Sequence, residues 1–170
     1  MSTDYNKRFI LFSKPFVDAI KDTFKVMMDT EITIHSPKIK NENKTHGDIA
    51  ALIGMNGLYI QDDEEHDFKG LLVIAWSMET YLKISSKMLM EEFSEYSEEI
   101  SDTGAEISNI VMGNAKKILA TNSYKIDMAT PSTIKGQNLE IKYPPKTKVI
   151  ETVISSDLGE FVMEICYQEI

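Results

Sequence analysis

The chain has 170 residues, of which 42% are hydrophobic and 26% charged, and its formal net charge at pH 7 is −9. This length and composition are typical of a folded protein with a substantial core, and we expect a single domain over residues 1–170. Nucleic acids and anionic membranes bind basic surfaces. The negative charge therefore argues against both as partners and favours a protein or a cationic ligand.

Targeting signals and cysteine content also narrow the class of protein. The longest apolar run, "GLLVIAW" at residues 70–76, is strand-sized and too short to span a bilayer. The N-terminal stretch is too polar for a secretory signal peptide, so we expect a cytoplasmic protein. The single cysteine, Cys166, excludes an internal disulfide and a multi-cysteine metal site. Its alternating neighbourhood predicts a packing residue within a strand.

The first half of the chain predicts one helix followed by strands. Ser13 as a cap and Pro15 in the first turn predict a helix start, and apolar residues recur at helical spacing to about Thr30. Four further segments predict, in order, a strand, a polar loop and two paired strands: 31–36, 37–47, 48–55 and 68–78. We interpret 56–67 as the connection between the paired strands.

The second half predicts a short helix over Met78–Met90 and a long helix that ends near Thr121, separated by an acidic stretch. Three strand candidates follow: 123–134, 147–155 and 159–168. Leu158-Gly159 suits a hairpin turn between the last two. Strict strand–helix alternation is missing, so we expect an α+β fold, an antiparallel sheet with long helices packed on one face. Two successive helix-plus-strands blocks suggest a duplication.

The long helix carries residues that a helix disfavours, since a mid-helix glycine costs about 1 kcal/mol against alanine. At helical spacing, one side holds Gly104, Ile107, Val111, Ala115 and Ile118, and the other holds Glu106, Asn109, Gly113 and Lys117. Asn109 and Gly113 thus point away from the core, beside a carboxylate. Ile110 and Met112 are expected to flank this polar stripe with apolar contact area, which predicts a docking surface.

An alternative interpretation is a capping box from Thr103 to Glu106, with Asn109 merely solvated and Gly113 a packing notch. The chemistry available to the stripe is limited in either case. The Asn109 amide cannot act as a base but can orient a water, and the Glu106 carboxylate can pair with a lysine. A catalytic role therefore requires a partner that brings the phosphate and any metal.

Other candidate sites are weak. The histidines His35, His46 and His66 are scattered, without the spacing of metal ligands on one helix. The acidic run 62–67 lacks the spaced ligands and glycine of a calcium loop, so we interpret it as a solvated loop. The sequence has no glycine-rich phosphate-binding loop, which argues against nucleotide use.

The long helix resembles the Glu-x-x-Asn…Gly-Asn-Ala signature of the CheC/CheX/FliY chemotaxis phosphatases, in Glu106-Ile-Ser-Asn109 and Gly113-Asn114-Ala115-Lys116. Residues 48–76 are similar to the family's strand pair, and Pro131–Gly136 is similar to its Pro-Thr-hydrophobic-x-Gly segment. The acidic run 62–67 is longer than the family's turn. A single Glu-x-x-Asn site and the chain length most resemble CheX.

The resemblance implies a CheX-like phosphatase domain with a duplicated CheC-like fold, a homodimer joined through its sheets, and hydrolysis of the aspartyl phosphate of a CheY-type response regulator. The regulator would supply a lysine and Mg²⁺, and the protein would need no cofactor of its own. Glu106 would pair with that lysine and Asn109 would align a water, while Gly113 and Asn114 would allow close approach. The alternative is a catalytically silent binding module that docks on a response regulator or a flagellar switch protein.

Overall fold

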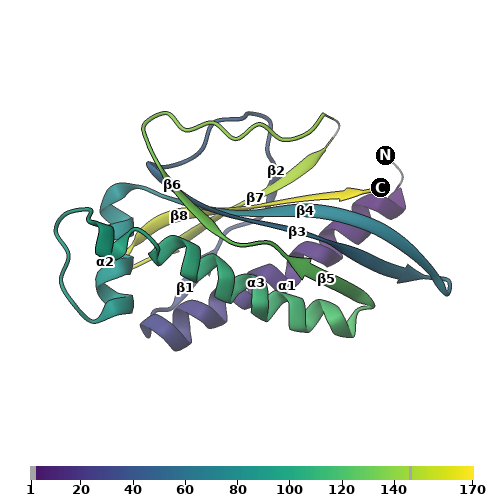
Figure 1. Cartoon of the computed structure of the whole chain (residues 1–170), viewed down its shortest axis with the longest axis horizontal. Coiled ribbons are helices and arrows are strands. Elements are labelled where there is room, and N and C mark those ends of the chain that lie inside the picture. Colours follow the sequence, from purple (N-terminus) through teal and green to yellow (C-terminus); the bar gives the residue numbers. More distant parts are fainter. Residues whose placement is uncertain (1–2, 146) are drawn as a thin grey trace.

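The computed structural model describes residues 3–145 and 147–170, which form an eight-stranded sheet and three α-helices (Figure 1). In chain order the elements are α1 (Thr3–Met28), β1 (Ile32–Ile34), β2 (Lys38–Ile39), β3 (Ile49–Gln61), β4 (Glu64–Trp76), α2 (Met78–Leu89), the short 3₁₀ helix η1 (Glu98–Ile100), α3 (Thr103–Thr121), β5 (Tyr124–Met128), β6 (Ser132–Lys135), β7 (Lys148–Ser156) and β8 (Gly159–Glu169). All of the strand pairs are antiparallel, which confirms the α+β prediction.

The two halves of the sheet have the same arrangement of strands on either side of its centre. The order is β1-β7-β8-β4-β3-β5, with β2 also pairing with β7 and β6 with β3. Each half of the chain therefore contributes a helix, two short strands and a long hairpin, and its short strands pair with the hairpin of the other half. The two central strands, β4 and β8, join the halves. This arrangement is the one expected from the two helix-plus-strands blocks in the sequence.

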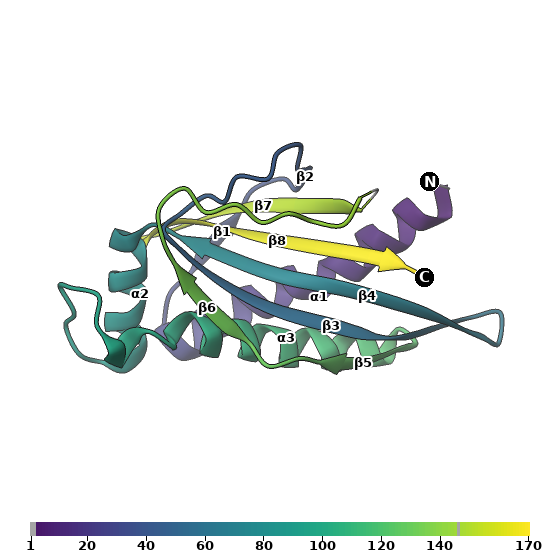
Figure 2. The ribbon, with the colours of Figure 1, turned by 45° about the horizontal axis from the view of Figure 1, so that its top comes forward.

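The helices α1 and α3 lie side by side on one face of the sheet (Figure 2). Alternate residues of the central strands point toward them, as strand geometry requires, and those of β4 are buried in the core: Phe68, Leu72, Ile74 and Trp76. Aromatic rings fill much of this layer. Phe12 of α1 packs on Tyr167 with ring centroids 4.6 Å apart, and Phe24 stacks on Phe161 at 5.0 Å.

The first helix begins ten residues before the predicted start at Ser13, because the apolar stripe continues toward the N-terminus through Tyr5, Phe9 and Phe12. Pro15 lies inside the helix instead of in its first turn. The Ser13 hydroxyl donates to the carbonyl of Ile10 at 2.9 Å and does not cap a helix start. Burial of the additional aromatic residues outweighs the local cost of the proline.

The strand pair in the middle of the chain is also longer than predicted. β3 and β4 have 13 residues each and are joined by Asp62-Asp63 alone, so most of the predicted connection 56–67 belongs to strands. Both aspartates adopt positive φ (53° and 62°), which suits a two-residue hairpin turn. The turn before β8 falls at Asp157-Leu158, one residue earlier than predicted.

Two other segments differ from their sequence interpretation. The predicted strand 123–134 is divided into β5 and β6, which pair with different parts of β3. The predicted loop 37–47 contains the two-residue strand β2. The strand over 31–36, the helix beginning at Met78 and the long helix ending at Thr121 agree with the predictions.

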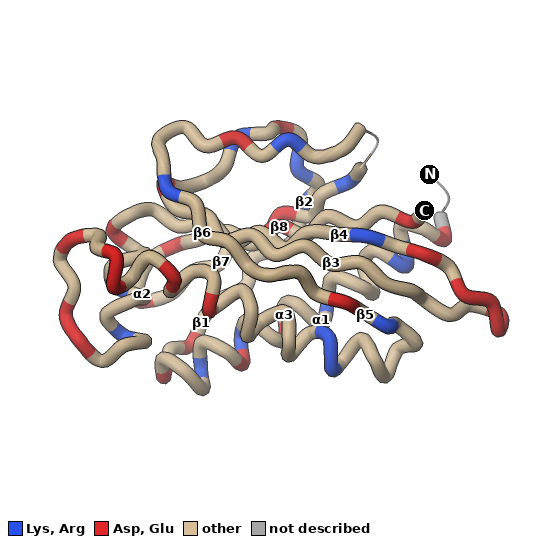
Figure 3. The backbone as a smooth tube through the Cα atoms, viewed as in Figure 1, with Lys and Arg blue, Asp and Glu red and all other residues tan. Residues whose placement is uncertain are grey.

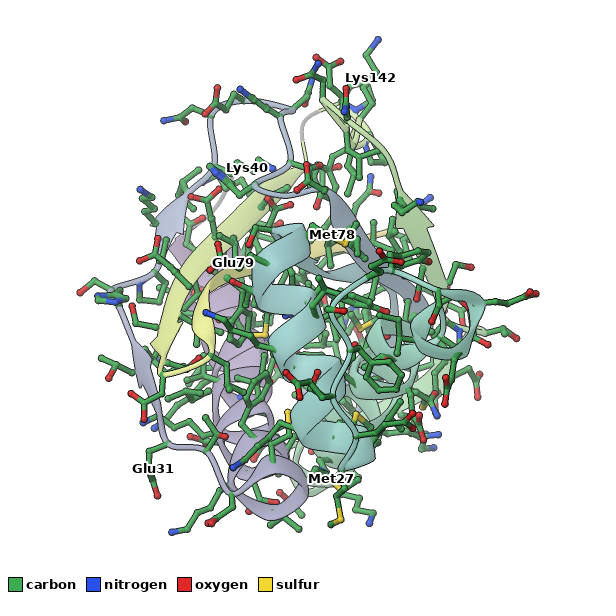
Figure 4. All side chains as sticks on the ribbon, turned by 90° about the vertical axis from the view of Figure 1, so that its left-hand side faces the viewer. Met27, Glu31, Lys40, Met78, Glu79 and Lys142 are labelled. Atoms are coloured by element: carbon green, nitrogen blue, oxygen red, sulfur yellow. The ribbon has the colours of Figure 1, made fainter. Side chains whose placement is uncertain are left out.

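The face of the sheet opposite α1 and α3 is partly covered by the loops 40–48 and 136–145, which are linked by backbone hydrogen bonds. Lys40 lies on this side of the sheet, away from α1 (Figure 4). Its ammonium is buried against the Glu164 carboxylate, which also accepts a hydrogen bond from the Tyr143 hydroxyl at 2.7 Å. Buried charges require such pairing.

Candidate functional site

Helix α3 separates into a buried sector and an exposed stripe. Ile107, Val111, Ala115 and Leu119 are buried, and α3 packs against both the sheet and α1. The opposite stripe holds exposed Glu106, Asn109 and Lys117 and half-buried Ile110, Gly113 and Asn114. The structure therefore brings six of the seven predicted site residues onto one outward surface.

Two predictions about this helix are wrong. Met112 is fully buried (0% exposed) and offers no contact area to a partner. Ile118, expected in the core, is 37% exposed. The cause is that α3 contacts two neighbouring layers, the sheet and α1, so that its buried sector is displaced and widened relative to a single apolar stripe.

The two polar residues at the centre of the motif are unpaired. Within residues 3–145 and 147–170, neither the Glu106 carboxylate nor the Asn109 carboxamide has a hydrogen bond or an ion pair. Three positions apart on one helix, they are neighbours on its surface. The Glu106 carboxylate can therefore accept charge-assisted hydrogen bonds from an incoming molecule. The Asn109 carboxamide can both donate and accept hydrogen bonds.

The capping-box interpretation of Glu106 is wrong. Asp102, which precedes α3, makes no side-chain cap, and the first free amides of the helix bond to residues of other elements. The Gly104 N–H donates to the Tyr81 hydroxyl and the Ala105 N–H to the Thr133 hydroxyl, each at 2.9 Å. The Glu106 carboxylate is therefore not used for capping.

Tyr81 also fixes the segment before α3. Its hydroxyl donates to the carbonyl of Ile100 at 2.8 Å while accepting from Gly104. The hydroxyl keeps its proton at neutral pH, as an ordinary tyrosine does, and burial raises its pKa further, to about 12. Sequence reasoning missed Tyr81 and Thr133 because neither is close to α3 in the chain, although Thr133 belongs to the Pro131–Gly136 segment that the resemblance singled out.

The two glycines of α3 have different roles. A Cβ at Gly104 would lie 3.0 Å from a ring atom of Trp76, so this glycine allows the first turn to pack closely in the core. A Cβ at Gly113 would meet nothing within 4 Å among the described residues. Gly113 is therefore not a packing notch within the molecule, and any reason for its small size lies outside the molecule.

The exposed stripe is not part of a large cavity. A groove with a volume of about 740 Å³ lies between the N-terminal half of α1 and the end of α3, where Leu11, Tyr59 and Ile118 line it. Glu106 and Asn109 do not line it. Small-molecule sites are usually concave, whereas an exposed helix surface fits a macromolecular partner.

The surroundings of the stripe are acidic. Figure 3 shows acidic residues gathered in the loop between α2 and α3 and at the tip of the β3–β4 hairpin. Those between α2 and α3 are Glu91, Glu92, Glu95, Glu98, Glu99 and Asp102. These carboxylates repel a free phosphate anion, although α3 itself carries Lys116 and Lys117. A phosphate whose charge is neutralised by cations on the molecule that carries it avoids this repulsion.

Within the described part of the chain, no group of three or more His, Cys, Asp or Glu side chains is placed to hold a metal. The histidines have separate neighbours: His35 bonds Ser155, His46 bonds Glu151, and the His66 ring stacks on Tyr59. None of the described helices has the length and apolarity needed to span a bilayer.

The family model and the most similar solved structures point to the same family. The family model "Chemotaxis phosphatase CheX" matches residues 63–155, more than half of the chain and all of α3. A CheC-like superfamily protein from Shewanella sp. PV-4 is 32% identical, with a TM-score of 0.78 and 99% of each chain covered. CheX from Vibrio vulnificus is 31% identical, with a TM-score of 0.79, covering 92% of this chain and 99% of its own.

A solved structure with lower identity contains a partner protein. The CheX–CheY–BeF₃–Mg²⁺ complex from Borrelia burgdorferi contains the same fold at 22% identity, with a TM-score of 0.73 over 93% of this chain and 97% of that one. The search of curated proteins found no match. From the family model and the two closer structures, the chain belongs to the CheX family of chemotaxis phosphatases.

Proposed function

We propose that this protein is a cytoplasmic phosphatase that hydrolyses the aspartyl phosphate of a CheY-type response regulator and so tunes chemotaxis signalling. The observation that carries the proposal is that Glu106 and Asn109 lie on an exposed helix surface without a partner among the described residues, in a chain of the CheX family. The acidic loop before α3 and the exposed position of the motif support a substrate that is itself a protein and that supplies Mg²⁺.

In this proposal the protein positions the reactants, and the regulator supplies the positive charges of its lysine and of Mg²⁺. Glu106 pairs with a lysine of the regulator and holds the docked pair in register. Asn109 orients a water whose oxygen attacks phosphorus as the bond to the aspartate oxygen breaks. The products are the aspartate carboxylate and dihydrogen phosphate, which retains both protons of the water. The Borrelia relative crystallised with CheY, BeF₃ and Mg²⁺ supports this choice of partner and metal.

The rest of the stripe forms the docking surface of the proposal. Ile110 contributes apolar area, Lys117 contributes a charge at the far end, and Gly113 and Asn114 leave room for the partner's backbone. We further propose that residues 1–170 form a single phosphatase domain and that two copies associate through sheet edges. An edge strand that is left unpaired is prone to such association.

A catalytically silent module that only docks on a regulator or a flagellar switch protein is the competing function. Both require the exposed surface, but only catalysis requires an amide at the position of Asn109. The presence of Asn109, at a position where alanine would form a better helix, favours the phosphatase.

The test is the lifetime of the phosphoryl group on a CheY phosphorylated with acetyl phosphate, with and without this protein. We expect the wild-type protein to shorten it, and Asn109→Ala and Glu106→Ala to lose at least about 100-fold in rate. Asn122→Ala, an exposed asparagine at the end of the same helix, is the matched control and should keep full activity. A fully active Asn109→Ala variant would show that the amide does not position water.

A further inference from the structure

The first turn of α3 is held by a strand that is distant in sequence. Thr133 of β6 pairs with Ala51 of β3, whose side chain faces the helices. From this side of the sheet the Thr133 hydroxyl accepts a hydrogen bond from the Ala105 N–H at 2.9 Å. The next residue after Ala105 is Glu106. The bond therefore holds the helix immediately before its exposed motif.

This bond takes the place of a local cap. A helix leaves its first amides without intrahelical partners, and a residue at the start of the helix usually satisfies one of them. Asp102 does not do so here. Instead the Gly104 amide is hydrogen-bonded to buried Tyr81 and the Ala105 amide to Thr133. These two bonds anchor the start of the helix to α2 and to the sheet.

A second contact links β6 to the same region. Lys135, two positions along the strand, places its ammonium 4.4 Å from the centre of the Tyr96 ring, in the loop that leads into α3. A cation over an aromatic ring at this distance is attractive. β6 therefore contacts both the first turn of α3 and the segment before it, and these contacts oppose sliding or rotation of the helix start.

We propose that Thr133 is a positioning residue, whose hydroxyl holds the first turn of α3 in the orientation that presents Glu106 and Asn109 to the regulator. The inference rests on the proposed function. Loss of the bond would let the helix start shift by a fraction of its 1.5 Å rise per residue. Misplacement of about 1 Å can cost around 100-fold in rate, so a smaller shift should cost roughly 10-fold.

The test compares three variants of the full chain. Thr133→Val removes the hydroxyl while keeping the shape of the side chain, and Thr133→Ser restores a hydroxyl. Ser132→Ala removes an exposed hydroxyl from the neighbouring residue of the same strand, whose side chain points to the face of the sheet opposite that of Thr133, and serves as the control. Each variant is assayed for dephosphorylation of phosphorylated CheY, for binding to CheY with beryllofluoride and Mg²⁺, and for hydrogen exchange at the Ala105 amide.

We expect Thr133→Val to lower kcat about 10-fold, to change the Kd less than the rate, and to speed exchange at Ala105. Thr133→Ser should recover most of the rate, and Ser132→Ala should match the wild type. A Thr133→Val variant with normal kcat below its melting temperature would overturn the inference, even if its Tm fell, because the bond would then be only a structural cap.

Failure of the proposed function has a different signature. If the wild-type chain leaves the phosphoryl lifetime unchanged, the proposed phosphatase activity is wrong, and so is the effect of Thr133 on a rate. Exchange at Ala105 still separates two cases: faster exchange in Thr133→Val shows that the hydroxyl holds the turn, and unchanged exchange shows that it does not.

Discussion

Replacing Gly113 by alanine should stabilise the protein and weaken its docking at the same time. A glycine inside a helix costs about 1 kcal/mol relative to alanine. The added Cβ would meet nothing within 4 Å in the part of the chain that the structure describes, so no steric penalty offsets this gain. For a chain of 170 residues, a gain of about 1 kcal/mol raises Tm by roughly 2–4 °C.

The other glycine of α3 provides the matched comparison. A Cβ at Gly104 would lie 3.0 Å from a Trp76 ring atom and 3.3 Å from the Tyr81 ring, and both of these side chains are fully buried. Overpacking of this kind costs about 1–3 kcal/mol. Gly104 also lies in the first turn, where alanine gains little, so Gly104→Ala should lower stability by roughly 1–2 kcal/mol.

The functional effect of Gly113→Ala follows from the same geometry. If a regulator's backbone approaches the helix at Gly113, the methyl group occupies the space that the partner needs. We expect KM for phosphorylated CheY to rise about tenfold, which corresponds to about 1.4 kcal/mol of binding, while kcat changes less. Thermal melts and phosphoryl-decay titrations on the two variants measure both effects.

Two results would refute this reasoning separately. A Gly113→Ala protein that melts no higher than the wild type would show that the space beside Gly113 is not open. A protein that melts higher but keeps the wild-type KM would show that the regulator does not approach the helix there. In the second case the stripe around Glu106 and Asn109 would have to be contacted from another direction.

Two further predictions concern the whole chain and its cysteine. The proposed homodimer should scatter light as twice the chain mass of 19.3 kDa at micromolar concentration, and a monomer would contradict it. Cys166 should resist thiol reagents in the folded state, because it is buried and burial raises its pKa to about 11 from 9.0. As pH rises, the Cys166 thiol ionises in the unfolded chain before it ionises in the folded chain. The stability that the buried, neutral thiol contributes is therefore fully present below pH 9 and is lost toward pH 11. Urea melts at pH 8 and 10 should therefore show a smaller alkaline loss for Cys166→Ala.

Much of the site could be predicted from the sequence because its signals are local. Helical periodicity depends on residues three and four apart, which sufficed to place Glu106, Asn109 and Gly113 on the outward side of α3. Period-two alternation likewise predicted the strand that contains Cys166, although β8 proves to be buried on both faces. These patterns are present in any fold that buries at least one side of each helix or strand.

The tertiary structure determined which neighbouring elements each helix and strand contacts. Met112 is buried and Ile118 exposed because α3 packs on α1 as well as on the sheet, and periodicity within one helix cannot state where a second neighbour lies. The bonds that hold the start of α3 join amides to hydroxyls 23 and 28 residues away, those of Tyr81 and Thr133. Sequence alone determined which side of α3 carries its polar motif, whereas contacts between distant segments decided how firmly that motif is held, since such contacts exist only once the sheet has formed.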